Sequence, residues 1–255
     1  MNIKANLLLA IALLGLAAPA WAVLPDEIQV YDDSFNPRGR IGVELHLNHT
    51  IDGATLPTYA GEVTTGGATR LTPEFSLGLG GGFEAGLYIN TVVDRHGTAF
   101  LAGAKLRMKY IIHPAPDGGL FYGVNVEVGR IGHRFEAGRT GLELRPILGW
   151  RSKDWLLVVN PNLEFALEGI DSNGVPDFAP GVKIGRKIAR GVMIGTEMYR
   201  DFGSFAGFAP IHEEATEVYA VVDVDRGPFV FNLGIGRGFS GADRWTVKTI
   251  ISLPF

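Results

Sequence analysis

Twelve segments of the chain alternate apolar and polar residues with a period of two. They span approximately 40–50, 70–79, 83–93, 99–110, 120–129, 141–150, 155–166, 177–186, 191–200, 216–225, 229–237 and 244–255. In a β-strand, such alternation places apolar side chains on one face and polar side chains on the other. Each segment has about 9 to 12 residues, the length that a tilted strand needs to cross a bilayer. The pattern predicts an all-β fold, a transmembrane up-and-down antiparallel β-barrel of about 12 strands over residues 39–255.

The connections distinguish this barrel from a soluble β-sandwich, which would alternate in the same way with its apolar faces inside. Links after odd-numbered segments are mostly long, as at 51–69 and 201–215, whereas links after even-numbered segments are mostly short, as at 80–82 and 151–154. Long outer loops alternating with short periplasmic turns are typical of outer-membrane barrels. An even number of strands also predicts that both chain ends face the periplasm.

The first residues predict export. Lys4 precedes an apolar stretch at 7–16, and Ala20-Trp21-Ala22 has the small residues of a cleavage site. The stretch is shorter than the roughly 20 residues that a transmembrane helix needs, so we interpret 1–22 as a signal peptide. Residues 23–38 would then lie in the periplasm or tuck into the barrel lumen. The expected location is the outer membrane of a Gram-negative bacterium, reached through the periplasm.

Aromatic residues of the apolar face fall near the strand ends, where amphipathic rings favour the two membrane interfaces. Outer-membrane lipid is therefore an expected partner. The predicted membrane-girdle residues are Phe83, Tyr110, Tyr122, Trp150, Trp155, Phe229, Trp245 and Phe255. Phe255 is also the last residue, and a terminal aromatic resembles the signal by which the barrel-assembly machinery recognises its substrates. That machinery is a second expected partner.

Four prolines lie inside the predicted strands, where each removes a ladder hydrogen bond. They are Pro73, Pro146, Pro161 and Pro180, and all four fall on the outward face. We expect bulges or local bends near the middle of these strands.

The polar face of the strands is expected to line the lumen. The candidate lumen-lining residues are Glu44, His46, Glu74, Glu84, Asn90, Lys105, Arg107, Lys109, Glu127, Glu143, Arg145, Asn160, Asn162, Glu164, Lys183, Glu197, Tyr199, Glu217, Asp223 and Lys248. Charges in a narrow lumen must be paired or hydrated. The column Lys105, Arg107 and Lys109 has two interpretations. It is part of a cross-strand ion-pair lattice that stiffens the barrel, or it is a basic ladder that guides anionic solutes.

Composition argues against other functional classes. There is no Cys, so neither a disulfide nor a thiolate metal site is expected, and the net charge of −4 disfavours a nucleic-acid partner. No His-x-Ser pair occurs, and no other nucleophile–base spacing predicts an enzyme. We therefore assign no catalytic residue, no metal and no cofactor.

Five stretches carry a family resemblance: 27–33, 42–48, 72–75 (Thr-Pro-Glu-Phe), 145–150 and 160–163 (Asn-Pro-Asn-Leu). They resemble an uncharacterised proteobacterial outer-membrane β-barrel family, related to the outer-membrane proteins associated with meta-pathway phenol degradation. The likeness covers most of residues 27–255. It implies a barrel exported to the outer membrane and, loosely, the passage of small organic molecules, and it assigns no binding residue.

Two functions remain open from the sequence. The first is a passive or facilitated pore for small molecules, anionic or aromatic ones among them. The alternative is a closed structural or adhesive outer-membrane barrel with a charge-paired lumen and no transport.

Overall fold

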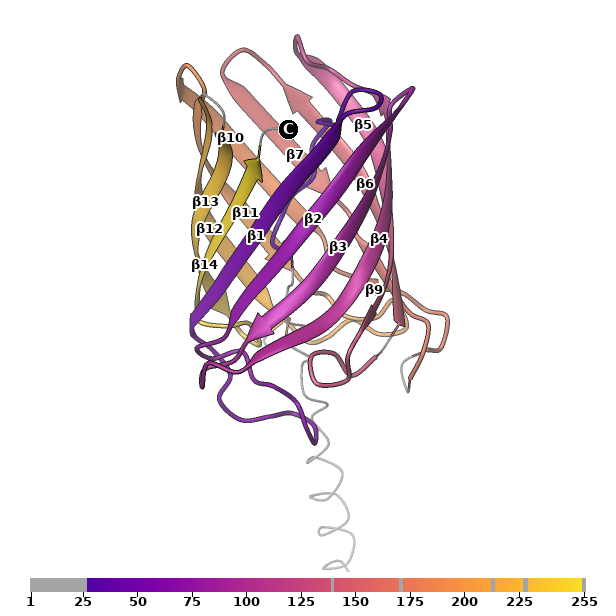
Figure 1. Ribbon diagram of the computed structural model, residues 1–255, viewed down its shortest axis with the longest axis vertical. Coiled ribbons are helices and arrows are strands. Elements are labelled where there is room, and N and C mark those ends of the chain that lie inside the picture. Colours follow the sequence, from indigo (N-terminus) through magenta and orange to yellow (C-terminus); the bar gives the residue numbers. More distant parts are fainter. Residues whose placement is uncertain (1–26, 139, 170–171, 212–213, 227–228, 254–255) are drawn as a thin grey trace, which may run out of the picture.

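The computed structural model describes residues 27–138, 140–169, 172–211, 214–226 and 229–253, which form a closed antiparallel β-barrel (Figure 1). Its strands are β1 (Ile41–Asp52), β2 (Thr69–Gly80), β3 (Phe83–Val93), β4 (Ala99–His113), β5 (Gly119–Ile131), β6 (Thr140–Arg151), β7 (Trp155–Asn160), β8 (Leu163–Ala166), β9 (Asp177–Phe178), β10 (Gly181–Ala189), β11 (Val192–Arg200), β12 (Thr216–Arg226), β13 (Phe229–Phe239) and β14 (Trp245–Leu253). The pairs β7/β8 and β9/β10 are each one interrupted strand, so the barrel has twelve strands, as predicted. The predicted signal peptide, 1–22, lies outside the described residues.

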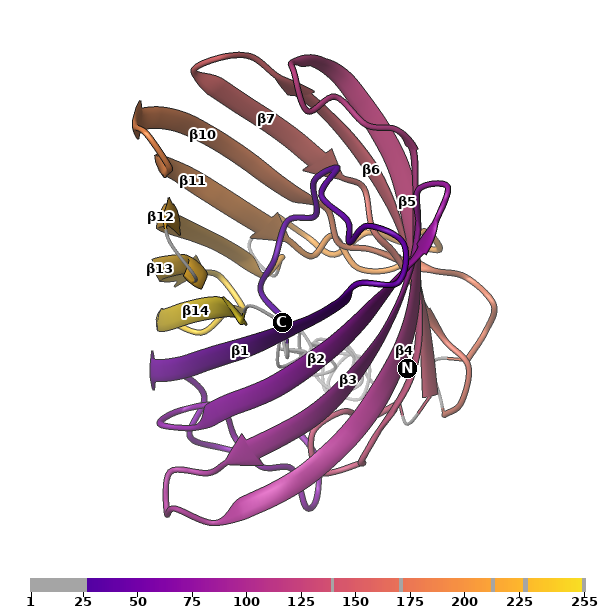
Figure 2. The ribbon, with the colours of Figure 1, turned by 45° about the horizontal axis from the view of Figure 1, so that its top comes forward.

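Each strand pairs with the next one along the chain, and β1 closes the ring on β14, with Val43 opposite Leu253 (Figure 2). Long loops gather at one end of the barrel and short turns at the other (Figure 1). Gly80, Gly81 and Gly82 form one of these short turns, and all three have positive φ angles, which glycine adopts without strain. Among the described residues, no helix is long and apolar enough to cross a membrane.

Side chains alternate between the two faces of the wall, as β2 illustrates. Thr72, Glu74 and Ser76 are buried, whereas Phe75 and Leu77 are 42% and 40% exposed. A water-soluble sandwich would bury the phenylalanine and expose the glutamate. A barrel that buries its polar face and exposes its apolar face suits a hydrocarbon surrounding.

Prolines interrupt the wall at one level. Asn160 pairs with Gly181 and Leu163 pairs with Phe178, so Pro161 lies opposite Pro180 between the two pairs. The same register argument places Pro146 of β6 opposite Pro161. The predicted irregularities are thus real at Pro161 and Pro180, where both strands break. The strands β6 and β2 continue through Pro146 and Pro73, but the pairing of β2 with β3 skips Thr72 and Pro73. Proline cannot donate to the ladder, and three in a row leave a local gap in the pairing.

Candidate channel lumen

The predicted lumen-lining side chains are all buried or half-buried. Thirteen are buried: His46, Glu74, Glu84, Asn90, Arg107, Lys109, Glu127, Arg145, Asn160, Asn162, Lys183, Glu197 and Lys248. The others, Glu44, Lys105, Glu143, Glu164, Tyr199, Glu217 and Asp223, are half-buried. Because the outer wall is formed by the opposite faces of the same strands, these side chains point into the ring.

The first cluster of charges lies on β1 to β4 around Arg107. Arg107 donates from Nε to Glu74 Oε1 at 2.7 Å and from Nη2 to Glu84 Oε1 at 2.8 Å. Lys109 Nζ lies 3.1 Å from Glu84 Oε1, and His46 Nε2 lies 3.2 Å from Glu74 Oε2. Each cation therefore has a carboxylate partner, as burial of a charge requires.

The second cluster lies on β10 to β14 around Glu197. Lys183 Nζ is 3.0 Å from Glu197 Oε1 and 2.9 Å from Asp223 Oδ2. Lys248 Nζ contacts the other oxygen of Glu197, and Tyr199 donates its hydroxyl to the same carboxylate at 2.7 Å. Here a single carboxylate binds two ammonium groups, whereas in the first cluster a single guanidinium binds two carboxylates.

A third, smaller group belongs to β5 and β6. Arg145 Nε donates to Glu143 Oε1 at 2.5 Å, and Asn125 Nδ2 donates to Glu127 Oε1 at 2.7 Å. Neighbouring strands bring these residues together because Asn125 lies directly opposite Arg145, and Glu127 directly opposite Glu143.

Between the clusters runs an inner segment, which we define as residues 27–38. It lies inside the ring and leads up to β1 (Figure 2). Lys248 Nζ donates to the carbonyl oxygen of Ile28 at 2.9 Å, and the backbone N–H of Asn36 donates to Glu84 at 2.6 Å. Asn160 binds Tyr31 twice, accepting from its backbone N–H at 2.6 Å and donating to its carbonyl oxygen at 3.0 Å. The sequence left the periplasm and the lumen open for residues 23–38, and Ile28, Tyr31 and Asn36 of this segment contact side chains of the lumen.

Tyr31 of the inner segment connects two of the charge clusters. The cationic groups of Arg145, Lys109 and Arg107 lie 4.5, 5.4 and 5.7 Å from the centroid of its ring. Its hydroxyl lies 2.5 Å from that of Tyr88 on β3. Burial, and then the nearby carboxylate of Glu27, raise the pKa of Tyr31 well above its ordinary value, so the hydroxyl remains protonated.

Sequence reasoning missed Glu27, Tyr31, Tyr88 and Tyr219. Tyr88 and Tyr219 fall at polar-face positions of β3 and β12, so the period of two could have identified them. Glu27 and Tyr31 lie before the first strand, where no such period applies.

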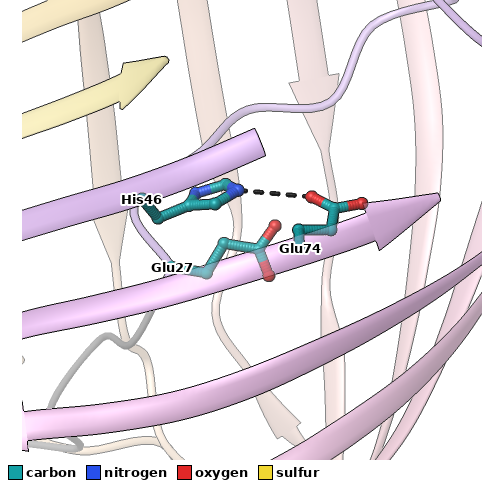
Figure 3. Close-up of side chains that lie close together, drawn as sticks. All are labelled: Glu27, His46 and Glu74. Carbon is teal, nitrogen blue, oxygen red and sulfur yellow. Dashed lines mark hydrogen bonds and ion pairs between the residues drawn. The ribbon is translucent and has the colours of Figure 1, made fainter. Parts of the chain in front are cut away.

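Glu27, His46 and Glu74 offer the only described grouping of acidic and histidine ligand atoms close enough to hold a metal, all within 4.8 Å of one another (Figure 3). Two carboxylates and an imidazole are chemically suited to a divalent cation. However, Glu74 also binds Arg107, and Glu27 accepts the hydroxyls of Tyr31 and Tyr88. Both oxygens of Glu74 and Oε1 of Glu27 are therefore engaged by protein groups, whereas Glu27 Oε2 has no hydrogen-bond partner among the described residues.

The predicted girdle residues lie on the outer face where they are described. Phe83, Tyr122, Trp150 and Trp155 are exposed, and Tyr110 and Trp245 are half-buried. Phe83 and Tyr110 stack with their ring centroids 4.1 Å apart. The side chain of Phe229 and the whole of Phe255 lie outside the described part of the chain, so the role predicted for Phe255 stays a prediction.

No protein-family model matches the sequence, and no curated protein sequence matches it either. Solved structures do match. An outer membrane channel from Pseudomonas putida F1 is 13% identical, covers 90% of this chain and 100% of its own, and has a TM-score of 0.58. The NanC porin is 12% identical over 84% of this chain and 100% of its own, with a TM-score of 0.57, and the KdgM porin is 10% identical over 84% and 99%, with a TM-score of 0.53. At such identities the likeness establishes the fold, which is that of porin-like outer-membrane β-barrels.

Proposed function

We propose that this chain is an outer-membrane channel for small solutes and that its inner segment is a removable obstruction. The observation that carries the proposal is the charged lining of the lumen, together with the way the inner segment is attached to it. Ionised groups are stable inside a barrel when water or a polar solute can reach them. The inner segment forms no strand with the wall, so its release would expose this lining without opening the barrel.

We infer that the solutes are small and anionic or aromatic. Lys105, Arg107 and Lys109 alternate along one face of β4, and an anion would compete with Glu84 for the last two. The ring of Tyr31 beside Arg145 supports the aromatic class, because guanidinium groups attract ring faces. A second structure of the KdgM porin, 12% identical to this chain with a TM-score of 0.50, is a complex with disordered oligogalacturonate.

The partners expected from the sequence remain part of this proposal. Outer-membrane lipid would surround the exposed apolar wall, and the barrel-assembly machinery would recognise the C-terminal Phe255. The same assembly route implies export through the periplasm.

Planar-bilayer conductance tests the channel. The comparison is between the full protein and a variant lacking residues 27–36, each first confirmed as folded by its heat-dependent gel mobility. We expect low conductance from the full protein and a several-fold increase from the variant, because the deletion removes the backbone that crosses the lumen. The conductance of the variant should fall when an aromatic carboxylate is added.

A closed structural barrel is the second candidate, and a specific observation favours it. Arg107 and Lys183 each bridge two carboxylates, which is what a stiffening ion-pair lattice requires. If the folded deletion variant conducted no more than the full protein, the channel hypothesis would be rejected in favour of a closed structural barrel.

A further inference from the structure

The outer wall carries a hollow of about 720 Å³ that spans β7 and β10 to β14. Thr196 and Ala220 lie opposite each other at its centre, and the same row continues to Ile184 on one side and Ile235 on the other. A pair of short side chains thus interrupts a row of long ones. Most of the lining is apolar and faces outward, so the hollow opens toward the hydrocarbon region of a membrane.

A cation and an aromatic ring lie at one end of this hollow. Arg186 of β10 is directly opposite Trp155 of β7, and its guanidinium carbon is 5.4 Å from the ring centroid. Arg186 is exposed, and within the described part of the chain no carboxylate lies within ion-pairing distance of it. A guanidinium on a lipid-facing wall is costly unless an anion neutralises it.

Further bases lie beyond Arg186, at the edge of the barrel that carries the short turns. Lys153, Lys187, Arg190 and Arg226 are exposed there. Arg226 Nε donates to the carbonyl oxygen of Arg190 at 2.8 Å, so these two residues are adjacent. Asp154 and Asp225 are the acidic neighbours, and they are outnumbered by the bases. Short turns are typical of the periplasmic end, which assigns this edge to the leaflet made of phospholipid.

We propose that the hollow binds one anionic phospholipid of the periplasmic leaflet. An acyl chain lies over Thr196 and Ala220, and the phosphate binds Arg186 beside Trp155. A guanidinium matches phosphate by paired hydrogen bonds, and tryptophan favours the headgroup level. The surrounding bases attract a headgroup with a net negative charge and repel the cationic end of a zwitterionic one. The site lies outside the lumen and does not depend on whether the barrel conducts.

Native mass spectrometry of the full protein in non-ionic detergent tests this site. The protein is mixed with equal amounts of phosphatidylglycerol and phosphatidylcholine that have identical acyl chains. We expect the wild-type protein to retain one phosphatidylglycerol in preference, and Arg186→Ala to bind it about tenfold more weakly, the effect of losing a charge-assisted hydrogen bond.

Arg237→Ala is the matched control. Arg237 is also exposed and lies 5.4 Å from the ring centroid of a tryptophan, Trp245, but it borders the other end of the hollow, beyond Ile235 and near the long loops. The Arg237→Ala protein should bind phosphatidylglycerol with the same affinity as the wild-type protein. Equal losses in both variants would mean that any surface arginine attracts the lipid, and would overturn the proposal.

A second variant tests the acyl chain separately. Ala220→Leu fills the hollow and leaves every charge in place, so it should weaken phosphatidylglycerol binding while the protein keeps its heat-dependent gel mobility. An unchanged affinity would overturn the site even if Arg186→Ala failed to fold. Equal retention of phosphatidylcholine would reject the headgroup assignment. Displacement of the lipid by millimolar inorganic phosphate would identify a simple anion site instead.

Discussion

The barrel wall and the inner segment are held in place by different kinds of contact. In the wall, backbone pairs run without a break along whole strands, as between β5 and β6 from Gly119–Arg151 to Arg130–Thr140. The inner segment has no strand and is attached at separate points, among them Lys248, Asn160 and Glu84. One region is a continuous ladder and the other is a set of individual hydrogen bonds.

This difference implies different modes of opening. In a membrane, a strand of the wall cannot leave without exposing unpaired backbone groups to hydrocarbon, at several kcal/mol for each group. Each point contact of the inner segment contributes only about 0.5–3 kcal/mol, and the groups that it releases can be hydrated in the lumen. The inner segment can therefore detach while the wall stays folded, which is the behaviour that a gate needs.

The two lysines that bind Glu197 provide the strongest test of this comparison. Lys248 holds both the wall and the inner segment, because it contacts Glu197 and also the carbonyl oxygen of Ile28. Lys183 forms its ion pairs with Glu197 and Asp223, both residues of the wall. Replacement of either by Met removes one partner of a buried ion pair and should lower the stability of the wall by about 3 kcal/mol, measured by the temperature of the gel-mobility shift.

Conductance should separate these two variants. Lys248→Met should increase the conductance of the channel, because it releases the inner segment, whereas Lys183→Met should leave conductance near the wild-type level. If both variants conducted equally, the wall and the inner segment would not be independent, and the comparison would fail.

The wall could be predicted from the sequence because each strand carries its own signal. The period of two identified all twelve strands to within a few residues, and prolines marked the two that break, at Pro161 and Pro180. Strand order then follows from the up-and-down topology. For this reason Glu84 and Lys109, on adjacent strands, could be expected as neighbours before any coordinates were known.

The inner segment could not be placed in this way. Tyr31 binds Asn160, which is 129 positions later in the chain, and Lys248 binds Ile28 across 220 positions. Such contacts exist only once the barrel has closed, and no local period records them. The alternation of apolar and polar residues also could not specify which cation binds which carboxylate. Arg107 of β4, for example, binds Glu74 of β2, although β3 lies between these two strands.

Two buried asparagines provide a smaller and more selective test. Asn160 makes two hydrogen bonds with the backbone of Tyr31, whereas Asn125 donates to Glu127 of its own strand. Asn160→Ala should weaken the attachment of the inner segment by about 1.4 kcal/mol, which corresponds to about a tenfold larger open fraction in single-channel records. Asn125→Ala should cause a similar loss of stability with no change in open fraction. Equal gating in both variants would contradict a specific role for Asn160.

The smallest effect is expected from pH, through Asp32 of the inner segment. Burial raises the pKa of Asp32, but hydrogen bonds from Ser34 and the charge of Arg151 outweigh it and hold the pKa below its ordinary value of 3.8. A carboxylate with a lowered pKa contributes stability above its ordinary pKa, and this contribution is lost as the pH falls through the lowered value. Acidification to about pH 3 should therefore loosen the inner segment and increase conductance relative to about pH 6. The expected increase in conductance is small because the side chains of Arg151 and Asp32 are about a quarter exposed, at 25% and 26%.

The Asp32→Asn variant tests this assignment. It should already conduct slightly more than the wild type at the higher pH, and its conductance should respond less to acid. An identical acid response in the wild type and in Asp32→Asn would assign the effect to other carboxylates, either those of the wall or Glu27 and Asp33 of the inner segment, and Asp32 would then have no part in the release.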